Sequence, residues 1–291
     1  MVEKMSKKKY FVTSDIHSFF TPLKKALEEA GFDISNKNHI LLILGDVFDR
    51  GNETLEVYDF LMSIPEDRLL LVKGNHEQLY MELLKKKFPQ SHDFHNGTVK
   101  TFCQIANLPG ITAEKIEEGY YYSCGTYFDH EKITPEAREM WDLVKEEVWN
   151  SKVTTFIESF KWKNFIEIDK YIFVHSFIPV NSEGTWYAPK YSFKENWRNA
   201  NDYEWEQAMW GCPWKQYKAG LLQPENEKGK TLVCGHWHAF GFREGLDGVV
   251  YKNESEIDFS TYYSKDIIAL DACTALSGIC NVFVVDLEVN N

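Results

Sequence analysis

Five short apolar runs of this chain each end in side chains that can bind metal ions. The runs are KYFVTSDIH, ILLILGDVFDRG, LLLVKGNHE, YIFVHS and TLVCGHWH, and the residues at their ends are Asp15, His17, Asp46, Asn75, His175, His236 and His238. Short apolar runs bounded by glycine and polar residues predict buried strands. Ligands of open α/β sheets bind in the crevice beyond the carboxyl ends of the strands. We therefore expect these side chains to meet at one place.

The donor types at the strand ends suit two borderline divalent cations, because they combine oxygen and imidazole nitrogen without the thiolates of a structural zinc site. Side chains two apart on an extended segment share a face, so Asp15 and His17 are expected to bind one cation together. His236 and His238 would do the same if their loop stays extended. Two cations ~3.5 to 4 Å apart need a bridging anion, and Asp46 is the predicted bridge. A bridging hydroxide would then attack phosphorus in line.

Three further residues are predicted to do chemistry beside the metals without binding them. His76 follows Asn75 directly, and Asp49 could fix its tautomer and raise its basicity, so that the pair protonates the leaving group. Arg50 is the expected phosphate clamp, because guanidinium donates in a planar fork. The alternative is that Asp49 and Arg50 merely pair with each other at the start of a helix.

Composition restricts the partners of this chain. The 291 residues carry 44 acidic and 32 basic side chains, a formal charge of -12, which disfavours tracking along nucleic acid but leaves a small phosphorylated substrate possible. The six cysteines show no CxxC spacing, which favours a reducing compartment. The basic N-terminus lacks a signal-peptide core, and no run approaches the ~20 apolar residues of a membrane span. We expect a cytoplasmic protein without membrane contact; its oligomeric state is open.

Strands and helices alternate along the first 88 residues, which predicts βαβ units and a largely parallel sheet in an α/β fold. Thr21 and Pro22 are expected to cap and open a helix that ends at Gly31, and a second helix is expected from Glu53 to Met62. Because the ligand runs extend from 15 to 238, we expect one domain over 1–291. After His238, IIALDAC and CNVFVVDLEV predict the closing strands.

Two stretches depart from this pattern. Residues 89–163 lack ligand-bearing strands, and Thr134-Pro135 opens an amphipathic helix with Met140, Val144 and Val148 on one face, so we predict an inserted helical cap. Residues 181–228 form a connection rich in Trp and Tyr. Packing of a poorly regular segment against the core is the favoured interpretation, and stacking on a base or shielding the metals is the alternative.

His92, Asp93 and His95 have a metal-like HDxH spacing. They fall in a polar connector between predicted elements. Solvated loop residues are therefore the favoured interpretation, over a third metal.

The blocks DIH, GDVFDRG, GNHE, VHS and GHWH resemble the signature blocks of the calcineurin-like metallophosphoesterases. GDVFDRG with GNHE is similar to the phosphoprotein phosphatase branch, including the small bacterial and phage members to which bis-nucleoside tetraphosphatases belong. HNGTVKT, around Asn96, resembles the NGGxxT segment of bacterial members. The resemblance implies a four-layer α/β/β/α sandwich of two mixed sheets, with the metal site at the carboxyl ends of the strands and the helical cap inserted.

Residue by residue, the resemblance implies one metal held by Asp15, His17 and Asp46 and completed by His238, and another held by Asp46, Asn75, His175 and His236. It implies His76 and Asp49 as the acid and its partner, with Arg50, Lys73 and Asn96 binding substrate. Lys73 stands where many phosphoprotein phosphatases have arginine. The implied cofactors are two divalent or mixed-valence ions, with manganese favoured and iron, zinc or cobalt as alternatives.

Three functions follow from these residues. The first is a dinuclear metal-dependent phosphatase of phosphoproteins or small phosphorylated molecules. The second is a bis(5'-nucleosyl)-tetraphosphatase type of pyrophosphohydrolase, which would stack a base on the aromatic segment. The third is a binding module that retains the metals without turnover. Intact His76, Asp49 and Arg50 favour an enzyme.

Overall fold

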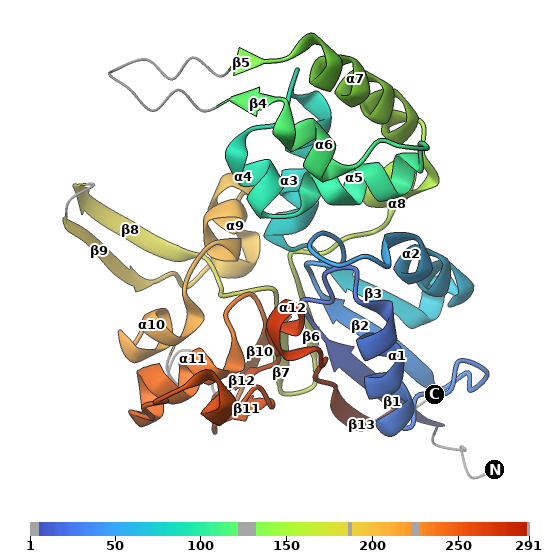
Figure 1. The fold of residues 1–291 in the computed structure, drawn as a ribbon. Coiled ribbons are helices and arrows are strands. Elements are labelled where there is room, and N and C mark those ends of the chain that lie inside the picture. The colour runs from blue at the N-terminus through green and yellow to red at the C-terminus, as the bar shows by residue number, and fades with distance from the viewer. Residues whose placement is uncertain (1–5, 122–131, 186–187, 223–226, 228, 290–291) are drawn as a thin grey trace.

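The computed structural model describes residues 6–121, 132–185, 188–222, 227 and 229–289. Two mixed sheets pack against each other at its centre (Figure 1). The first sheet has the order β13-β1-β2-β3, with bounds Phe283–Val289, Ser6–Thr13, His39–Leu44 and Leu69–Val72. The second has the order β11-β12-β10-β7-β6, with bounds Tyr262–Tyr263, Ile267–Ala269, Thr231–Cys234, Tyr171–Val174 and Phe165–Ile168. The pairs β1 with β2, β2 with β3, β7 with β10 and β10 with β12 are parallel.

Alternating side chains of each strand pack into different layers, which explains why the runs are apolar throughout. Val12 and Leu42 point from the first sheet to Phe173 and Val233 of the second, in a cluster between the sheets. Phe11, Leu41 and Ile43 pack on the other face of the first sheet against α1 (Phe20–Glu29) and α2 (Thr54–Ser63). A third cluster joins the outer face of the second sheet to α9 (Asp202–Met209) and α11 (Ala239–Phe242). The predicted four-layer α/β/β/α fold is confirmed.

The first two helices lie close to their predicted limits. Gly31 adopts the left-handed φ of 81° just beyond α1, as expected for a helix-ending glycine. The predicted N-cap is wrong: α1 begins at Phe20, one residue before Thr21, and the residue before it gives no side-chain cap. Thr21 instead donates its backbone N–H and its hydroxyl to Glu53, 32 residues away. Thr21 therefore bonds to a residue far along the chain instead of capping its own helix.

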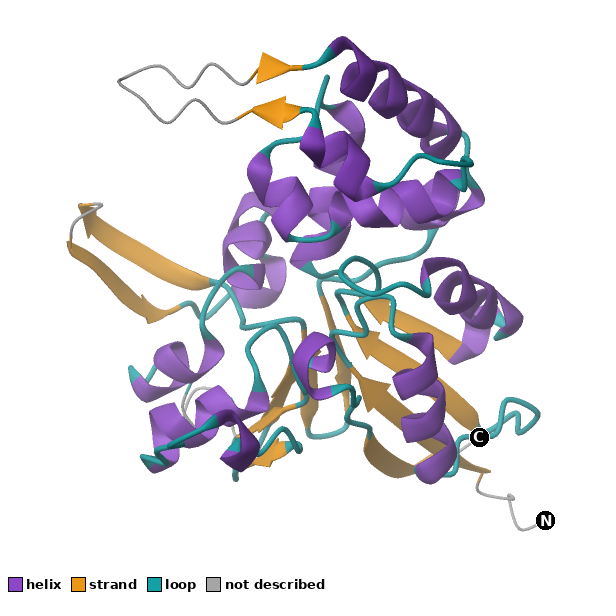
Figure 2. Cartoon of the chain, in the orientation of Figure 1, coloured by secondary structure: helices purple, strands orange, loops and turns teal. Residues whose placement is uncertain are grey.

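The described residues between 89 and 163 are mainly helical and lie above the first sheet in Figure 2. Their elements are α4 Ser91–His95, α5 Thr98–Ala106, α6 Ala113–Glu118, β4 Tyr120–Tyr121, β5 Lys132–Ile133, α7 Pro135–Trp149 and α8 Lys152–Ser159. Thr134 caps α7 by accepting the Ala137 N–H, and Val144 and Val148 are buried as predicted. These helices pack on α3 (Asn75–Lys85), and their apolar residues share one cluster with α1 and α2. The cap is therefore continuous with the outer helical layer.

Residues 181–228 are more regular than predicted. They hold the hairpin β8–β9 (Val180–Thr185 and Ala188–Phe193), which projects from the body in Figure 1, and the helices α9 and α10 (Pro213–Lys218). Trp197 and Trp205 are buried in the core, as the packing interpretation requires. Tyr191, Tyr203 and Trp210 are exposed. The described part of this segment thus contains both core aromatic residues and exposed ones. Trp186 and Tyr187 lie outside the described residues.

The HDxH residues lie on α4 and not in an irregular connector. Asp93 is 1% exposed, so the expectation of a solvated residue is wrong for it. Its carboxylate accepts hydrogen bonds from the Lys86 amine at 2.9 and 3.0 Å and from the Gln90 N–H at 2.7 Å. Burial of a charge requires such partners, so Asp93 acts as a structural anion that fixes the start of α4.

Other elements are short. They comprise the helix α12 Thr274–Ser277, the 3-10 helices η1 Glu66–Arg68, η2 Trp197–Asn199 and η4 Glu254–Glu256, and the π-helical turn η3 Arg243–Asp247. The five described cysteines are free thiols, and Cys124 lies outside the described residues. Within the described ranges, none of the helices is both long and apolar enough to cross a membrane.

Candidate metal centre

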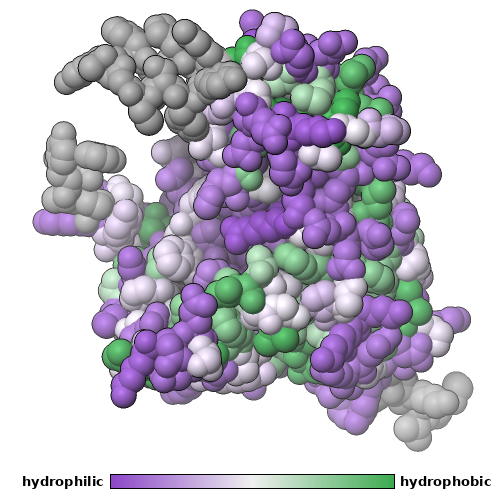
Figure 3. All heavy atoms as spheres, in the orientation of Figure 1, coloured by the Kyte–Doolittle hydropathy of each residue, from purple (hydrophilic) through white to green (hydrophobic). Residues whose placement is uncertain are grey.

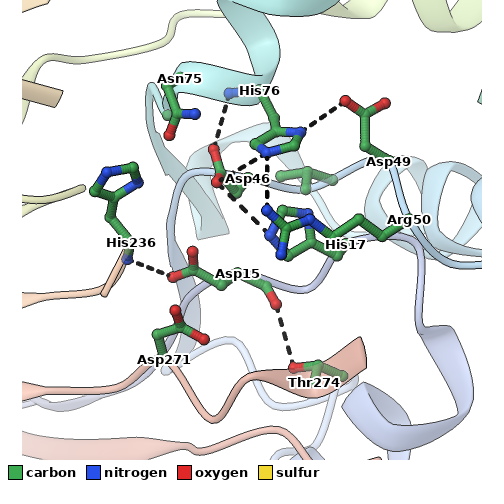
Figure 4. Close-up of polar contacts among 12 residues, drawn as sticks. Asp15, His17, Asp46, Asp49, Arg50, Asn75, His76, His236, Asp271 and Thr274 are labelled. Carbon is green, nitrogen blue, oxygen red and sulfur yellow. Dashed lines mark hydrogen bonds and ion pairs between the residues drawn. The ribbon is translucent and has the colours of Figure 1, made fainter. Parts of the chain in front are cut away.

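The loops that follow β1, β2, β3, β7 and β10 meet where the two sheets approach each other, and Asp15, His17, Asp46, Asn75 and His236 lie there (Figure 4). Asp15, His17, Asp46, Asn75 and His175 are between 1% and 4% exposed. Backbone hydrogen bonds tie the loops together, including those from the Asp15 N–H to Gly45 and from the Gly235 N–H to His175. The parallel strand ends therefore deliver the predicted side chains to one buried cluster.

Left-handed backbone conformations concentrate in these loops. Of the ten non-glycine residues with positive φ in the described part of the chain, seven lie here: Asp15, His17, Ser18, Asp46, Asp49, Arg50 and His236. Such a conformation costs an L-residue on the order of 1 to 3 kcal/mol and persists only where the surrounding structure imposes it. The expectation that Asp15 and His17, and then His236 and His238, lie on extended segments is therefore wrong. Sharp turns, rather than strand periodicity, aim these side chains.

Asp46 lies between two groups of possible metal donors. One group is His17, Asp46 and His76, and the other is Asp46, His175 and His236, with the donor atoms of each group within 4.8 Å of one another. The Asp46 Oδ2 is 3.7 Å from the His17 Nε2, and its Oδ1 is 3.4 Å from the His175 Nε2. The two carboxylate oxygens thus face different groups, as a bridging ligand requires.

Two histidines have the tautomer that leaves one nitrogen free for a metal. The Nδ1 of His17 donates to the Phe48 carbonyl at 3.0 Å, and the Nδ1 of His175 donates to the Leu44 carbonyl at 2.6 Å. The lone pair of each Nε2 then faces the cluster. The Nε2 of His175 lies 2.8 Å from the Asn75 Oδ1, also an acceptor. A cation shared by these acceptors would resolve their repulsion, so the residues present fit the implied metals.

Asp15 and His238 lie outside the donor groups that contain His17 and His236, the residues with which the sequence pattern paired them. The Asp15 Oδ2 accepts the His236 N–H at 2.9 Å, and its carboxylate is not in either donor group among the described residues. His238 is also outside both groups; its Nε2 lies 3.8 Å from the Oδ2 of Asp271. Asp271 is buried next to Asp15 and was not predicted. It follows the apolar run IIAL, so the strand-end pattern used for the other ligands could have found it.

His76 makes the predicted contact with Asp49. Its Nδ1 is 2.7 Å from the Asp49 Oδ2, which also accepts the Thr98 hydroxyl at 2.8 Å. The Nε2 of His76 lies 3.9 Å from the Asp46 Oδ2 and 3.5 Å from an Arg50 guanidinium nitrogen. Arg50 is exposed, and its guanidinium points toward the centre and not toward Asp49 (Figure 4). Thr98 was missed, because its role depends on a contact across 49 residues.

Glu77 is a third residue that the sequence analysis did not single out. It is 3% exposed, and its carboxylate accepts the backbone N–H groups of Gly74, Asp46 and Val47 at 2.8, 3.1 and 2.9 Å. A Cβ on Gly74 would collide with the Asp46 side chain, so only glycine allows this approach. Glu77 therefore holds the Asp46 loop against the start of α3. Glu77 is the glutamate of the GNHE block, so the motif already contained this residue.

Burial and mutual repulsion shift the titration of these groups. Burial would raise the pKa of Asp46, but His175, His76 and His17 together hold it below its ordinary value. Burial, Asp271 and Asp46 raise the pKa of Asp15 well above its usual range. Burial and His175 lower the pKa of His236 to about 3. The crowding of carboxylates and neutral imidazoles is what a site for cations would display.

Lys73 and Asn96 have no contact with this cluster that would assign them a role. Lys73 is half-buried, and its backbone N–H donates to the Lys163 carbonyl. Asn96 caps the end of α4, and the following Gly97 lies so close to the Arg50 backbone that a Cβ would clash with it. Substrate contact by Lys73 and Asn96 stays a prediction.

Known proteins resemble part of this chain. One segment of 68 residues is 40% identical to the symmetrical bis(5'-nucleosyl)-tetraphosphatase of Buchnera aphidicola subsp. Acyrthosiphon pisum (strain Tuc7), covering 23% of each chain. Another of 72 residues is 36% identical to serine/threonine-protein phosphatase 1 of Salmonella typhimurium, covering 25% of this chain and 31% of that protein. The matches thus cover only 23% and 31% of the lengths of these two relatives.

A solved structure described as a putative diadenosine tetraphosphatase aligns over 98% of this chain and 95% of its own, with a TM-score of 0.42 and 15% identity. The sequence profile of the calcineurin-like phosphoesterases matches residues 8–240, from β1 through the loop that carries His236 and His238. This range includes all five ligand-bearing runs. The chain belongs to the calcineurin-like phosphoesterase family.

Proposed function

We propose that this protein is a dinuclear metal-dependent phosphatase that hydrolyses phosphoesters of proteins or small molecules. The position of Asp46 carries the proposal. Its two oxygens face separate groups of imidazoles at 3.7 and 3.4 Å, and it is 2% exposed. A buried carboxylate shared by two donor groups is the arrangement expected of a bridge between two cations.

The proposed ligands of one cation are Asp15, His17 and Asp46, with His238 as an additional candidate, and those of the other are Asp46, Asn75, His175 and His236. Manganese is the favoured metal, with iron, zinc and cobalt as alternatives, because these donors serve all four. When bound, the cations neutralise phosphoryl charge and lower the pKa of water so that it attacks phosphorus near neutral pH. Nitrogen donors fixed by backbone carbonyls give the cations a preformed site.

The proposed acid is His76. Burial alone would lower its pKa, but Asp46 and the hydrogen bond that His76 donates to Asp49 raise it, which favours the protonated form. Its Nδ1 donates to Asp49 at 2.7 Å, which leaves Nε2, 3.5 Å from an Arg50 guanidinium nitrogen, as the atom that would carry the transferable proton. Arg50 can hold two phosphoryl oxygens with its planar fork and so bring the leaving oxygen to His76.

The test is hydrolysis of an aryl phosphate with Mn²⁺ added. We expect Asp46→Asn to lower kcat/KM by about 1,000-fold, equivalent to about 4 kcal/mol of transition-state stabilisation, because the bridging charge is lost. The matched control is Asp59→Asn, a surface carboxylate on α2. Elemental analysis of the purified proteins should give two bound metals for the wild type and fewer for Asp46→Asn. Full activity of Asp46→Asn would refute the role of Asp46.

A second candidate is hydrolysis of dinucleoside polyphosphates, supported by the likeness of one segment to a bis(5'-nucleosyl)-tetraphosphatase. The exposed ring of Trp210 stands 6.1 Å from that of His236 and could stack on a base. Comparing diadenosine tetraphosphate with a phosphopeptide separates the two activities. A metal-loaded protein that hydrolyses neither these nor the aryl phosphate would favour the third function, a binding module.

A further inference from the structure

A groove of about 770 Å³ lies beside the metal centre, between the β8–β9 hairpin and α9. Its aromatic walls are Tyr191, Tyr203 and Trp210, which are 52%, 69% and 46% exposed. Exposed rings of this size are costly to leave in water unless a ligand covers them. Neither the proposed metal ligands nor the proposed acid uses this groove.

The groove shares a wall with the metal centre. Trp210 lines it and also packs edge-on against His236, with 6.1 Å between the ring centroids. The neighbouring Gly211 also lines it, and its carbonyl accepts the hydroxyl of Ser176 at 2.7 Å. Ser176 directly follows the candidate ligand His175. A substrate whose phosphate reaches the metals can therefore extend into the groove.

The polar groups of the wall are acceptors and carboxylates. Among its described lining residues there is no lysine or arginine, while Glu183 and Glu204 are both present. Glu204 is paired with Lys194 at 2.8 Å, but Glu183 is exposed and has no ion pair with a described residue. The Oε1 of Gln216 is buried in this wall without a hydrogen-bond donor among the described residues. Such a wall repels a polyphosphate chain and calls for a cationic donor.

Taking the proposed phosphatase function as its basis, we infer that this groove binds an arginine side chain of a phosphopeptide substrate, a few residues from the phosphorylated one. Guanidinium stacks on aromatic rings and donates several hydrogen bonds in one plane. The exposed Tyr203 and Trp210 rings and the exposed Glu183 carboxylate supply these partners. A nucleobase could also use the rings, but only a cationic group gains the charge attraction of the carboxylate.

The experiment uses fluorescent peptides that carry a non-hydrolysable phosphonate in place of phosphoserine, with Mn²⁺-loaded full-length protein. One arginine is placed in turn at each position on either side of the phosphonate, and each peptide is matched by its citrulline counterpart, a neutral isostere of arginine. Fluorescence anisotropy gives the Kd values. We expect one position at which arginine binds about tenfold more tightly than citrulline, and a smaller preference at high salt.

Two substitutions locate the effect. Glu183→Gln, which keeps the shape of the side chain, and Tyr203→Leu, which keeps an apolar surface without the ring face, should each remove most of the arginine preference. The control is Glu206→Gln, on α9 but outside the groove lining, which should keep the full preference.

Equal affinity for arginine and citrulline at every position would overturn the inference, as would a preference that survives Glu183→Gln and Tyr203→Leu. Tighter competition by diadenosine tetraphosphate than by any peptide, relieved by Tyr203→Leu, would reassign the groove to a nucleobase. The proposed function fails separately, by the absence of metal-dependent hydrolysis of the aryl phosphate. The binding assay does not need turnover, so the two failures are distinguishable.

Discussion

The loops of the metal centre and the groove beside it place their side chains in contrasting surroundings. Asp46 and His17 are 2% and 4% exposed and are held by left-handed turns, whereas Tyr203 and Trp210 are 69% and 46% exposed on a helix and its end. Figure 3 shows mostly hydrophilic residues across the middle of the visible face, between the cap and the two sheets. The difference matches the division of roles that we propose, with the reaction chemistry in the buried loops and substrate contact on the open wall.

The strongest test of this contrast lies within the aromatic segment. Trp197 is fully buried, contacts Phe165 and Trp205, and donates its Nε1–H to Glu227 at 2.7 Å. We expect Trp197→Ala to lower the free energy of unfolding by about 3 to 5 kcal/mol. Tyr203→Ala, on the exposed wall, should change it by less than about 0.5 kcal/mol. Urea unfolding followed by circular dichroism measures both. Similar losses would show that the two aromatic sets are not distinct.

A smaller effect is expected at the partner of His76. Asp49→Asn should lower kcat for the aryl phosphate about 100-fold near neutral pH, the usual weight of a positioned acid. Asp46 and Asp49 raise the pKa of His76 against the effect of burial, and an acid works only while protonated. Removing the Asp49 charge should therefore lower that pKa and move the alkaline limb of the pH profile to lower pH. The surface variant Asp142→Asn is the control, and an unmoved limb would contradict the assignment.

The smallest effect is expected at Thr98, which supports Asp49 from the start of α5. Thr98→Val removes the hydroxyl that donates to the Asp49 Oδ2 at 2.8 Å, and we expect kcat to fall about tenfold, equivalent to about 1.4 kcal/mol. Thr98→Ser keeps the donor and should restore most of the rate. Equal rates for valine and serine would show that the residue only fills space.

The predictions from sequence succeeded where the evidence was local. An apolar run followed by a polar side chain predicts a buried strand and its end, and that was enough to gather Asp15, Asp46 and His236 in one place. The helix that ends near Gly31 and the helix start at Thr134 also followed from short-range patterns. The parts that failed were those where a distant partner decides: Thr21 bonds to Glu53, and Asp93 is buried beside Lys86.

The sequence by itself determined the α/β class, the order of the ligand-bearing strands and the donor types, because each follows from patterns a few residues long. Only the tertiary structure decided which donor side chains belong to each of the two groups that share Asp46. Left-handed turns at Asp15, His17 and His236 aim side chains in directions that strand periodicity cannot give, and they set Asp46 between two groups while His238 turns to Asp271. The roles of Glu77 and Thr98 also depend on the tertiary structure, since their hydrogen-bond partners lie about 30 and 49 residues away along the chain.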